Sequence, residues 1–281
     1  MFSVLYGIAS ALSWGVADFA GGLASRKLGV YLVVFYGNIL GLLALVFAVT
    51  LYPETIPEPK SIMFAGLAGI LGSISLVILF YSMTCGQMSI AAPVSALFAA
   101  ILPIVVGIFL QGMPAQLQFV GFGFALLAVW LISLGDTKLP FQLDRLFSLR
   151  LPVLAGIGFG CYFIVMHYAT NGSTSVIWLM ISSYVTGTLV TFFFVKIRRE
   201  TFSVQRVAMG VVLVHVACNV GGNFFYLHAL KSGRLDISSA LSSLYPGGTV
   251  ILAWLILKER IFLRQWFGII SALIAIIFFT V

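Results

Sequence analysis

The sequence has 281 residues, of which 61% are hydrophobic and only 8% are charged, and its mean hydropathy is +1.14. Soluble proteins carry about 25% charged residues, so an aqueous globule could not bury this much apolar surface, and the chain is expected to fold in a lipid bilayer. The formal net charge of +7 comes from short segments between apolar runs. We interpret it as membrane-flanking charge and not as a nucleic-acid-binding surface.

Ten apolar stretches are long enough to cross the hydrocarbon as helices. In chain order they are 3–24, 31–51, 61–84, 89–110, 117–134, 152–169, 175–195, 206–230, 237–257 and 263–281. The first has no basic segment before it, so we interpret it as a retained span and not as a signal peptide. The runs are too long and too continuously apolar for barrel strands. The predicted fold class is therefore an all-α polytopic membrane protein with ten transmembrane helices.

The second half of the sequence repeats the first. The matched pairs include Gly86 with Gly233, Ser95 with Ser242, and Gln118 with Gln265. Each copy holds five spans, an odd number, so the second copy must enter the membrane from the opposite side and the repeats are inverted, a plan typical of transporters. We assign 1–135 to the first repeat, 136–151 to a connecting loop and 152–281 to the second repeat.

The basic residues predict an orientation. Of the 15 Lys and Arg residues, only Lys60, Lys231 and Arg234 fall in even-numbered loops, and the others fall in odd-numbered loops. Because cytoplasmic loops carry an excess of Lys and Arg, we expect the odd-numbered loops to be cytoplasmic and both termini to lie outside, in a bacterial-type inner membrane.

Two groups of motifs resemble a known family. The first span contains Ala11-Leu12-Ser13-Trp14-Gly15, then Asp18-Phe19 and Ala24-Ser25-Arg26-Lys27; the second repeat contains Gly233, Ser242-Ser243-Leu244-Tyr245-Pro246, Leu257-Lys258-Glu259-Arg260 and Gln265-x-x-Gly268. These segments are similar to the first helix and to the ninth and tenth helices of EamA-type transporters, within the drug/metabolite transporter superfamily. The resemblance covers essentially the whole chain.

The resemblance implies a ten-helix secondary carrier whose central cavity is lined mainly by the first, third, fourth, sixth, eighth and ninth helices. Relatives carry amino acids, amines, drugs, nucleotide sugars or phosphorylated sugars, often in exchange for a proton or another solute. Many have a glutamate after the fourth helix, where this sequence has Gln111-Gly112-Met113-Pro114. Relatives are also usually described with cytoplasmic termini, which differs from the orientation that the basic residues indicate.

Asp18 is the only carboxylate that we place within a span. An ionised carboxylate in hydrocarbon is costly, so it is expected to face a wet cavity or a partner. It could bind a coupling proton or a cation, or it could be a helix-end carboxylate paired with Arg26 or Lys27. Its counterpart in the second repeat is His167, and we hypothesise that the two form a proton relay.

The eighth span carries a polar stripe of His215, Asn219 and Asn223 at four-residue spacing, with Tyr226 beside it. This spacing places the three polar groups on one helical face. The stripe could be a substrate-facing wall with donors and acceptors, or it could make hydrogen bonds between helices without a substrate role.

The ninth span contains Tyr245-Pro246-Gly247-Gly248, in which proline removes a backbone hydrogen bond and the glycines weaken the next turn. The result is either carbonyl groups freed at a cavity or a simple kink.

Aromatic residues within the spans could bind a cationic amine through cation–π attraction. The candidates are Trp14, Tyr36, Tyr81, Tyr162, Trp178 and Tyr184. We expect only Trp14 and Tyr81 to face a cavity, Tyr81 because its repeat counterpart is Tyr226, and we expect the others to be packing residues or interface anchors.

An enzymatic interpretation is poorly supported. Phe163-x-x-x-His167 and His215-x-x-x-Asn219 fit two short motifs of intramembrane prenyl-protein endopeptidases, but these enzymes also need paired glutamates, and no glutamate lies in any span. Single cysteines inside the spans, Cys85, Cys161 and Cys218, have no metal-ligand spacing. Neither a metal nor a permanent cofactor is implied.

The sequence therefore predicts a secondary transporter for a small polar or amphipathic metabolite, such as an amine or amino acid, that works by alternating access. The few cations within the spans argue against a strongly phosphorylated substrate. The predicted substrate-binding residues are Trp14, Asp18, Tyr81, His215, Asn219, Asn223, Tyr226 and Tyr245, with Asp18 and His167 as the coupling pair. The expected partners are the substrate and lipid, and the chain is expected to be a monomer or homodimer. The alternative is a lipid flippase or scramblase with a polar groove.

Overall fold

The computed structural model describes residues 2–85, 88–133, 143–173, 175–202, 206–257 and 262–280. All regular secondary structure in these ranges is helical, which confirms the predicted fold class. Two parts of the sequence interpretation, residues 136–142 of the connecting loop and the motif residues 258–260, lie outside the described residues.

The helices follow the ten predicted spans, with the ninth span divided in two. They are α1 (Phe2–Leu28), α2 (Val30–Leu51), α3 (Pro59–Cys85), α4 (Met88–Gln111), α5 (Gln116–Ser133), α6 (Leu143–Thr170), α7 (Ile177–Ile197), α8 (Arg206–Ser232), α9 (Leu235–Ser242), α10 (Tyr245–Leu257) and α11 (Leu263–Thr280). Eight segments, one of them the combined α9 and α10, are long and apolar enough to cross a membrane, and two shorter apolar helices lie in α5 and α11.

One boundary differs from the prediction. Helix α6 begins at Leu143, so part of the predicted loop 136–151 is helical and Pro152 lies inside the helix. The strongly apolar part of α6 begins only at Leu149. Hydropathy therefore marked where the lipid-compatible segment begins, whereas the helix itself extends further toward the N-terminus.

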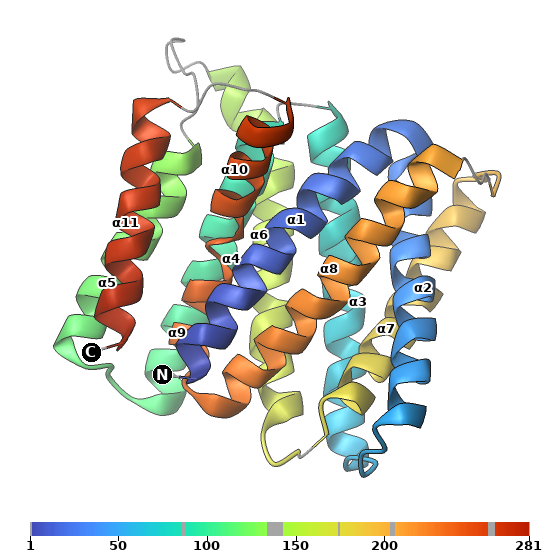
Figure 1. The fold of residues 1–281 in the computed structure, drawn as a ribbon, viewed down its shortest axis with the longest axis horizontal. Coiled ribbons are helices and arrows are strands. Elements are labelled where there is room, and N and C mark those ends of the chain that lie inside the picture. Colours follow the sequence, from blue (N-terminus) through green and yellow to red (C-terminus); the bar gives the residue numbers. More distant parts are fainter. Residues whose placement is uncertain are drawn as a thin grey trace.

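The two halves of the chain are arranged with opposite directions. In Figure 1 the ends of α1, α3, α5, α7 and α10, after which the odd-numbered connections of the predicted spans begin, lie at the top, and the start of α1 and the ends of α2, α4, α6, α8 and α11 lie at the bottom. Helices α1 and α6 therefore run in opposite directions. The helix contacts also interchange between the halves: α1 packs on α8 as α6 packs on α3, α1 on α10 as α6 on α4, and α2 on α8 as α7 on α3. A twofold relation between the halves requires this interchange.

The break between α9 and α10 lies at Ser243 and Leu244. Pro246 has no N–H to donate to the carbonyl of Ser242, which accounts for the interruption. All side chains from 235 to 246 are buried, and a Cβ atom on Gly15 of α1 would lie 2.7 Å from the carbonyl oxygen of Tyr245. The broken helix is thus packed closely against α1.

Arg234 ties the start of α9 to the end of α4. Its guanidinium donates to the buried carboxylate of Asp236 at 2.7 Å and to the carbonyl oxygens of Gln111 and Gly112 at 3.1 and 2.7 Å. The Gln111 side chain in turn accepts from the backbone N–H of Leu235 at 2.9 Å. The final carbonyls of a helix lack intrahelical partners and favour a cation, so this contact stabilises the end of α4.

A second tie joins the halves at the same end of the molecule. The carboxylate of Glu54, between α2 and α3, accepts hydrogen bonds from the backbone N–H groups of Val176 and Ile177 at 3.0 and 2.8 Å and from the hydroxyl of Ser175 at 2.6 Å. An anion at a helix start satisfies the unpaired N–H groups there. The helix ends that these ties join, namely the end of α4, the start of α9, the end of α2 and the start of α7, lie at the same end of the molecule in Figure 1.

We predict that Arg234→Ala destabilises the protein by about 3–5 kcal/mol, because it leaves the carboxylate of Asp236, which is fully buried, without its cation. Unfolding by titration with sodium dodecyl sulfate measures this loss. The control is Lys60→Ala at an exposed position, which should change the free energy of unfolding by no more than about 0.5 kcal/mol. Equal stabilities of the two variants would contradict this account of the tie.

Candidate functional site

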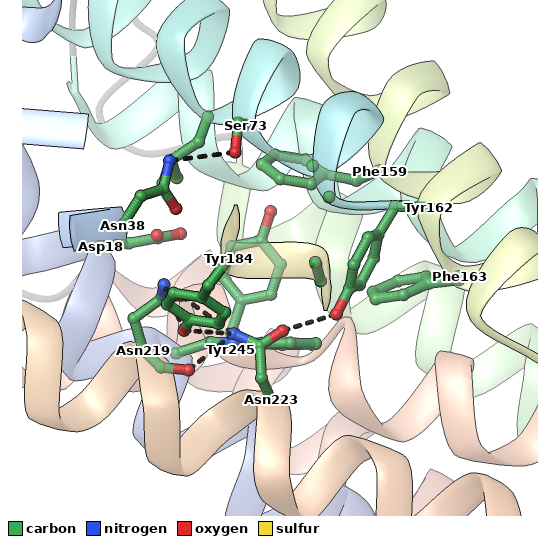
Figure 2. Close-up of a pocket in the computed structure, with 15 residues that line it drawn as sticks. Asp18, Asn38, Ser73, Phe159, Tyr162, Phe163, Tyr184, Asn219, Asn223 and Tyr245 are labelled. Carbon is green, nitrogen blue, oxygen red and sulfur yellow. Dashed lines mark hydrogen bonds between the residues drawn. The ribbon is translucent and has the colours of Figure 1, made fainter. Parts of the chain in front are cut away.

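A cavity lies among the middle parts of α1, α2, α3, α6, α7, α8 and the start of α10 (Figure 2). Its lining residues are Trp14, Asp18, Asn38, Gly69, Gly72, Ser73, Leu76, Phe159, Tyr162, Phe163, Ser183, Tyr184, Asn219, Asn223 and Tyr245. Its volume is about 80 Å³, well below the roughly 300–1,000 Å³ of ordinary ligand pockets. A solute larger than a few water molecules therefore requires the surrounding helices to move apart.

The set of lining helices differs from the one that the family resemblance implies. No described residue of α4 lines the cavity, whereas Asn38 of α2 and Tyr184 of α7 do. Close packing accounts for the contribution of α7: a Cβ atom on Gly69 of α3 would lie 2.0 Å from the carbonyl oxygen of Ser183. The missing side chain lets α7 approach α3 closely enough to reach the cavity wall.

Asp18 is the only carboxylate in the described wall of the cavity. Its side chain is only 7% exposed, and it makes no ion pair or hydrogen bond with any described residue. Among the described residues no ion pair joins Asp18 to Arg26 or Lys27, so the structure gives no support to that alternative. Figure 2 shows Asp18 beside Asn38, at one end of the lining.

Two asparagines and two tyrosines form a hydrogen-bonded network in the wall of the cavity. The hydroxyl of Tyr162 donates to Asn223 Oδ1 at 2.5 Å, and the side-chain amides of Asn219 and Asn223 donate to the hydroxyl oxygen of Tyr184 at 3.2 and 3.3 Å. Asn223 Nδ2 also donates to the carbonyl oxygen of Asn219 at 2.7 Å. The network joins α6, α7 and α8 and fixes the orientation of polar groups at the cavity (Figure 2).

An aromatic layer closes another side of the cavity. Trp14 stacks on Phe163 with ring centroids 5.7 Å apart, and Tyr226 lies behind them, 5.5 Å from Trp14. Gly222 makes this arrangement possible, because a Cβ atom there would lie 2.4 Å from Trp14 Cδ1. The indole ring of Trp14 lines the cavity, and behind it the layer is packed against Tyr226.

Five of the eight predicted substrate-binding residues line the cavity: Trp14, Asp18, Asn219, Asn223 and Tyr245. The other three lie elsewhere. Tyr226 is fully buried behind the wall, and its hydroxyl lies 3.1 Å from Ser239 Oγ. Tyr81 is 46% exposed in the last turn of α3.

His215 of α8 is buried against α1 and α2, next to Gly21 and Gly37. Its Nδ1 donates to the carbonyl oxygen of Ala17 at 2.8 Å, and its Nε2 has no hydrogen-bond partner. His167 lies in the last turn of α6 and is not among the lining residues. The geometry therefore gives no support to a relay between His167 and Asp18. The described residues also contain no group of three potential metal ligands.

Comparison with known proteins agrees with the fold. The sequence matches the EamA-like transporter family over residues 1–134 and 147–281. The chain belongs to this family. It is therefore a multi-pass membrane transporter of the drug/metabolite transporter superfamily, whose members are transporters and not enzymes. No curated protein matches the sequence.

Solved structures match this EamA-like transporter as well, with 27 matching chains. One of them, described only as "Crystal structure of protein", has 13% sequence identity and a TM-score of 0.79, with 99% of this chain and 96% of that chain covered. At this identity the likeness shows the fold alone.

Sequence analysis missed five polar residues of the cavity. Tyr162 and Tyr184 were assigned to packing or to the membrane interface, and Asn38, Ser73 and Ser183 were not singled out. Asn38 Nδ2 donates to Ser73 Oγ at 3.1 Å. An asparagine within an apolar span needs a polar partner or a cavity, and this signal was present in the sequence.

Two glycines of α8 give a matched test of the aromatic layer. We predict that Gly222→Ala destabilises the transporter by about 1–3 kcal/mol, because the new methyl group collides with Trp14. Gly210 has no atom within 4 Å of its Cβ position, so Gly210→Ala should stabilise the helix by about 0.4–1 kcal/mol. Detergent-induced unfolding measures both, and the same sign for the two variants would contradict the packing described.

Proposed function

We propose that this transporter carries a small amine or amino acid through the cavity by alternating access. The observation that carries the proposal is Asp18, a buried carboxylate in the cavity wall without a basic partner. Such a group needs a counter-ion within the membrane, and an ammonium group or a coupling proton supplies it. Binding at Asp18 neutralises a charge that the protein itself leaves uncompensated.

The remaining wall suits the rest of such a substrate. The amides of Asn219 and Asn223 and the hydroxyl of Tyr162 offer donors and acceptors, and the ring of Trp14 suits a cation or an apolar side chain. No Lys or Arg lines the described cavity. A phosphorylated substrate would need such cations, so amines, amino acids or neutral metabolites are favoured.

Alternating access is supported by the relation between the halves. The two repeats interchange their contacts around the cavity, so rocking of one repeat against the other could expose the site to each side in turn. The ties of Arg234 and of Glu54 both join the two repeats at the end of the even-numbered connections. Opening the cavity toward that end would require these hydrogen bonds to break.

The orientation of the transporter follows from charge. The ends of α1 and α7 and the starts of α6, α8 and α11 share one end of the molecule (Figure 1). Most of the Lys and Arg residues of the described chain belong to these helix ends. We assign this end to the cytoplasm of a bacterial-type inner membrane, with both termini outside.

We predict that amines or amino acids raise the melting temperature of the purified wild-type protein and not that of Asp18→Asn. At a ligand concentration of about 100 times Kd the stabilisation is about 2.7 kcal/mol, which a thermal-shift screen detects. The control is Glu58→Gln, which removes an exposed carboxylate and should keep the full shift. An equal shift in Asp18→Asn would refute the role of Asp18, and a response to lipids alone that depends on Asp18 would favour the flippase.

Labelling of single cysteines tests the orientation. In a Cys85→Ser background, which removes an exposed thiol, we expect a membrane-impermeant maleimide added to intact cells to label Asn171→Cys and not Lys27→Cys. Both positions are exposed. Lys27 lies at the end of α1 and Asn171 follows the end of α6, and these helices end at opposite ends of the molecule (Figure 1). The reverse labelling pattern would show that the assignment from charge is inverted.

A further inference from the structure

A second cavity lies at the opposite flank of the bundle from α5 and α11, toward the end of the odd-numbered connections. It is formed by the start of α2, the second half of α3 and the end of α7, and its volume is about 490 Å³. Its lining residues are Tyr31, Ile74, Val77, Ile78, Phe194, Ile197 and Arg198. It shares no lining residue with the cavity of Asp18, so the two are separate sites.

The two ends of this groove differ in chemistry. Ile74, Val77 and Ile78 of α3 and Ile197 of α7 give it an apolar floor and rim, and Ile197 is 58% exposed on the outer surface. The helices α2, α3 and α7 lie together at one side of the bundle in Figure 1. In a bilayer this surface faces lipid, so an acyl chain can enter the groove from the side.

The polar end of the groove is formed by Arg198 and Tyr31. The guanidinium of Arg198 lies 5.6 Å from the centroid of the Tyr31 ring, and it makes no ion pair or hydrogen bond with a described residue. Its backbone N–H closes the end of α7 through the carbonyl oxygen of Phe194 at 2.9 Å. The cation is therefore held at the mouth of the groove, with its N–H donors available to a ligand.

The local charge favours an anion at this mouth. Lys196, Arg198 and Arg199 lie at the end of α7, against one carboxylate, that of Glu200. A Cβ atom on Gly29 would lie 3.5 Å from the Glu200 carboxylate, which places Glu200 at the start of α2. The side chain of Lys196 lies over Phe192, a residue that does not line the groove, so Arg198 is the cation positioned at the mouth.

We propose that this groove binds one anionic phospholipid, with an acyl chain along the apolar floor and the phosphate on the guanidinium of Arg198. Basic sites between membrane helices on the cytoplasmic side suit anionic headgroups, and arginine donates to phosphate oxygens through a planar fork of N–H groups. The site is independent of the transported substrate. Its occupant ties α2, α3 and α7 together, next to the segments that hold Asn38, Ser73 and Tyr184 at the transport cavity.

Thermal-shift titration of the full-length protein in a neutral detergent tests the proposal, with phosphatidylglycerol and phosphatidylcholine of identical acyl chains as probes. Phosphatidylglycerol should raise the melting temperature of the wild type more than phosphatidylcholine does. Arg198→Gln should abolish this difference and weaken the apparent Kd for phosphatidylglycerol about fivefold, as expected for the loss of one lipid-contacting cation. Lys196→Gln and Arg199→Gln are the matched controls and should retain the difference.

Native mass spectrometry gives a second measurement that does not depend on unfolding. The wild type, Lys196→Gln and Arg199→Gln should each retain one phosphatidylglycerol under activation that strips it from Arg198→Gln. Equal effects of the two lipids on the wild type would show annular lipid only and overturn the proposal. The proposal would also be overturned if Arg198→Gln kept the preference for phosphatidylglycerol. Equal loss of the preference in Arg198→Gln, Lys196→Gln and Arg199→Gln would overturn it as well, because it would show binding by diffuse surface charge. Asp18 does not line this groove, so Asp18→Asn should keep the preference for phosphatidylglycerol. Loss of lipid binding is therefore distinguishable from loss of substrate binding at Asp18.

Discussion

A carboxylate inside a membrane protein has to be compensated, because hydrocarbon supplies neither water nor counter-ions. Asp18 is buried in the middle of α1 without a cation or hydrogen-bond donor among the described residues. The other buried carboxylate of the described chain, Asp236, shows the contrasting solution: it is paired with Arg234 at 2.7 Å and accepts from the N–H of Ile237. The carboxylate of Asp236 is satisfied by the protein, whereas no described residue supplies a cation or a hydrogen bond to that of Asp18.

The cavity around Asp18 is a consequence of how the two repeats pack. Each repeat contributes helices that contact the other repeat in corresponding pairs, and the site forms where these pairs meet. Glycines on the facing helices accommodate the larger side chains of the site: Trp14 lies against Gly222, and Asn38 and Ser73 lie against Gly187. The same close packing keeps the cavity small. A carrier of this type is thus able to hold its polar groups in a fixed network while its helices remain closely packed.

Sequence reasoning predicted the helices well and the site incompletely, for physical reasons. A membrane span leaves a hydropathy signal of about 20 residues, so the ten spans could be predicted. Pro246 and its neighbouring glycines indicated an irregularity in the ninth span, but left open whether it is a break or a simple kink. Residues at four-residue spacing drift by about 40° around a helix at each step. His215 is two such steps from Asn223, so the two side chains leave the helix in different directions. His215 points to the carbonyl of Ala17, whereas Asn219 and Asn223 reach the cavity.

The direction of an aromatic side chain depends on the facing helix and cannot be read from its own span. Tyr184 reaches the cavity because Gly41 on α2 leaves space for its ring, with a Cβ position only 2.4 Å from Tyr184 Cε1. Tyr81 was chosen because its repeat counterpart is Tyr226, but one lies at the surface and the other in the core. Equivalent positions in two diverged repeats need not have equivalent surroundings.

The most direct test of the transport site is uptake by proteoliposomes. The compound that gives the largest thermal shift would be used in radiolabelled form with wild-type protein, Asp18→Asn and Glu58→Gln. The account predicts saturable uptake by the wild type and by Glu58→Gln, and no uptake above that of empty liposomes by Asp18→Asn. Undiminished uptake by Asp18→Asn would contradict the central claim that this buried carboxylate holds the substrate or its coupling proton.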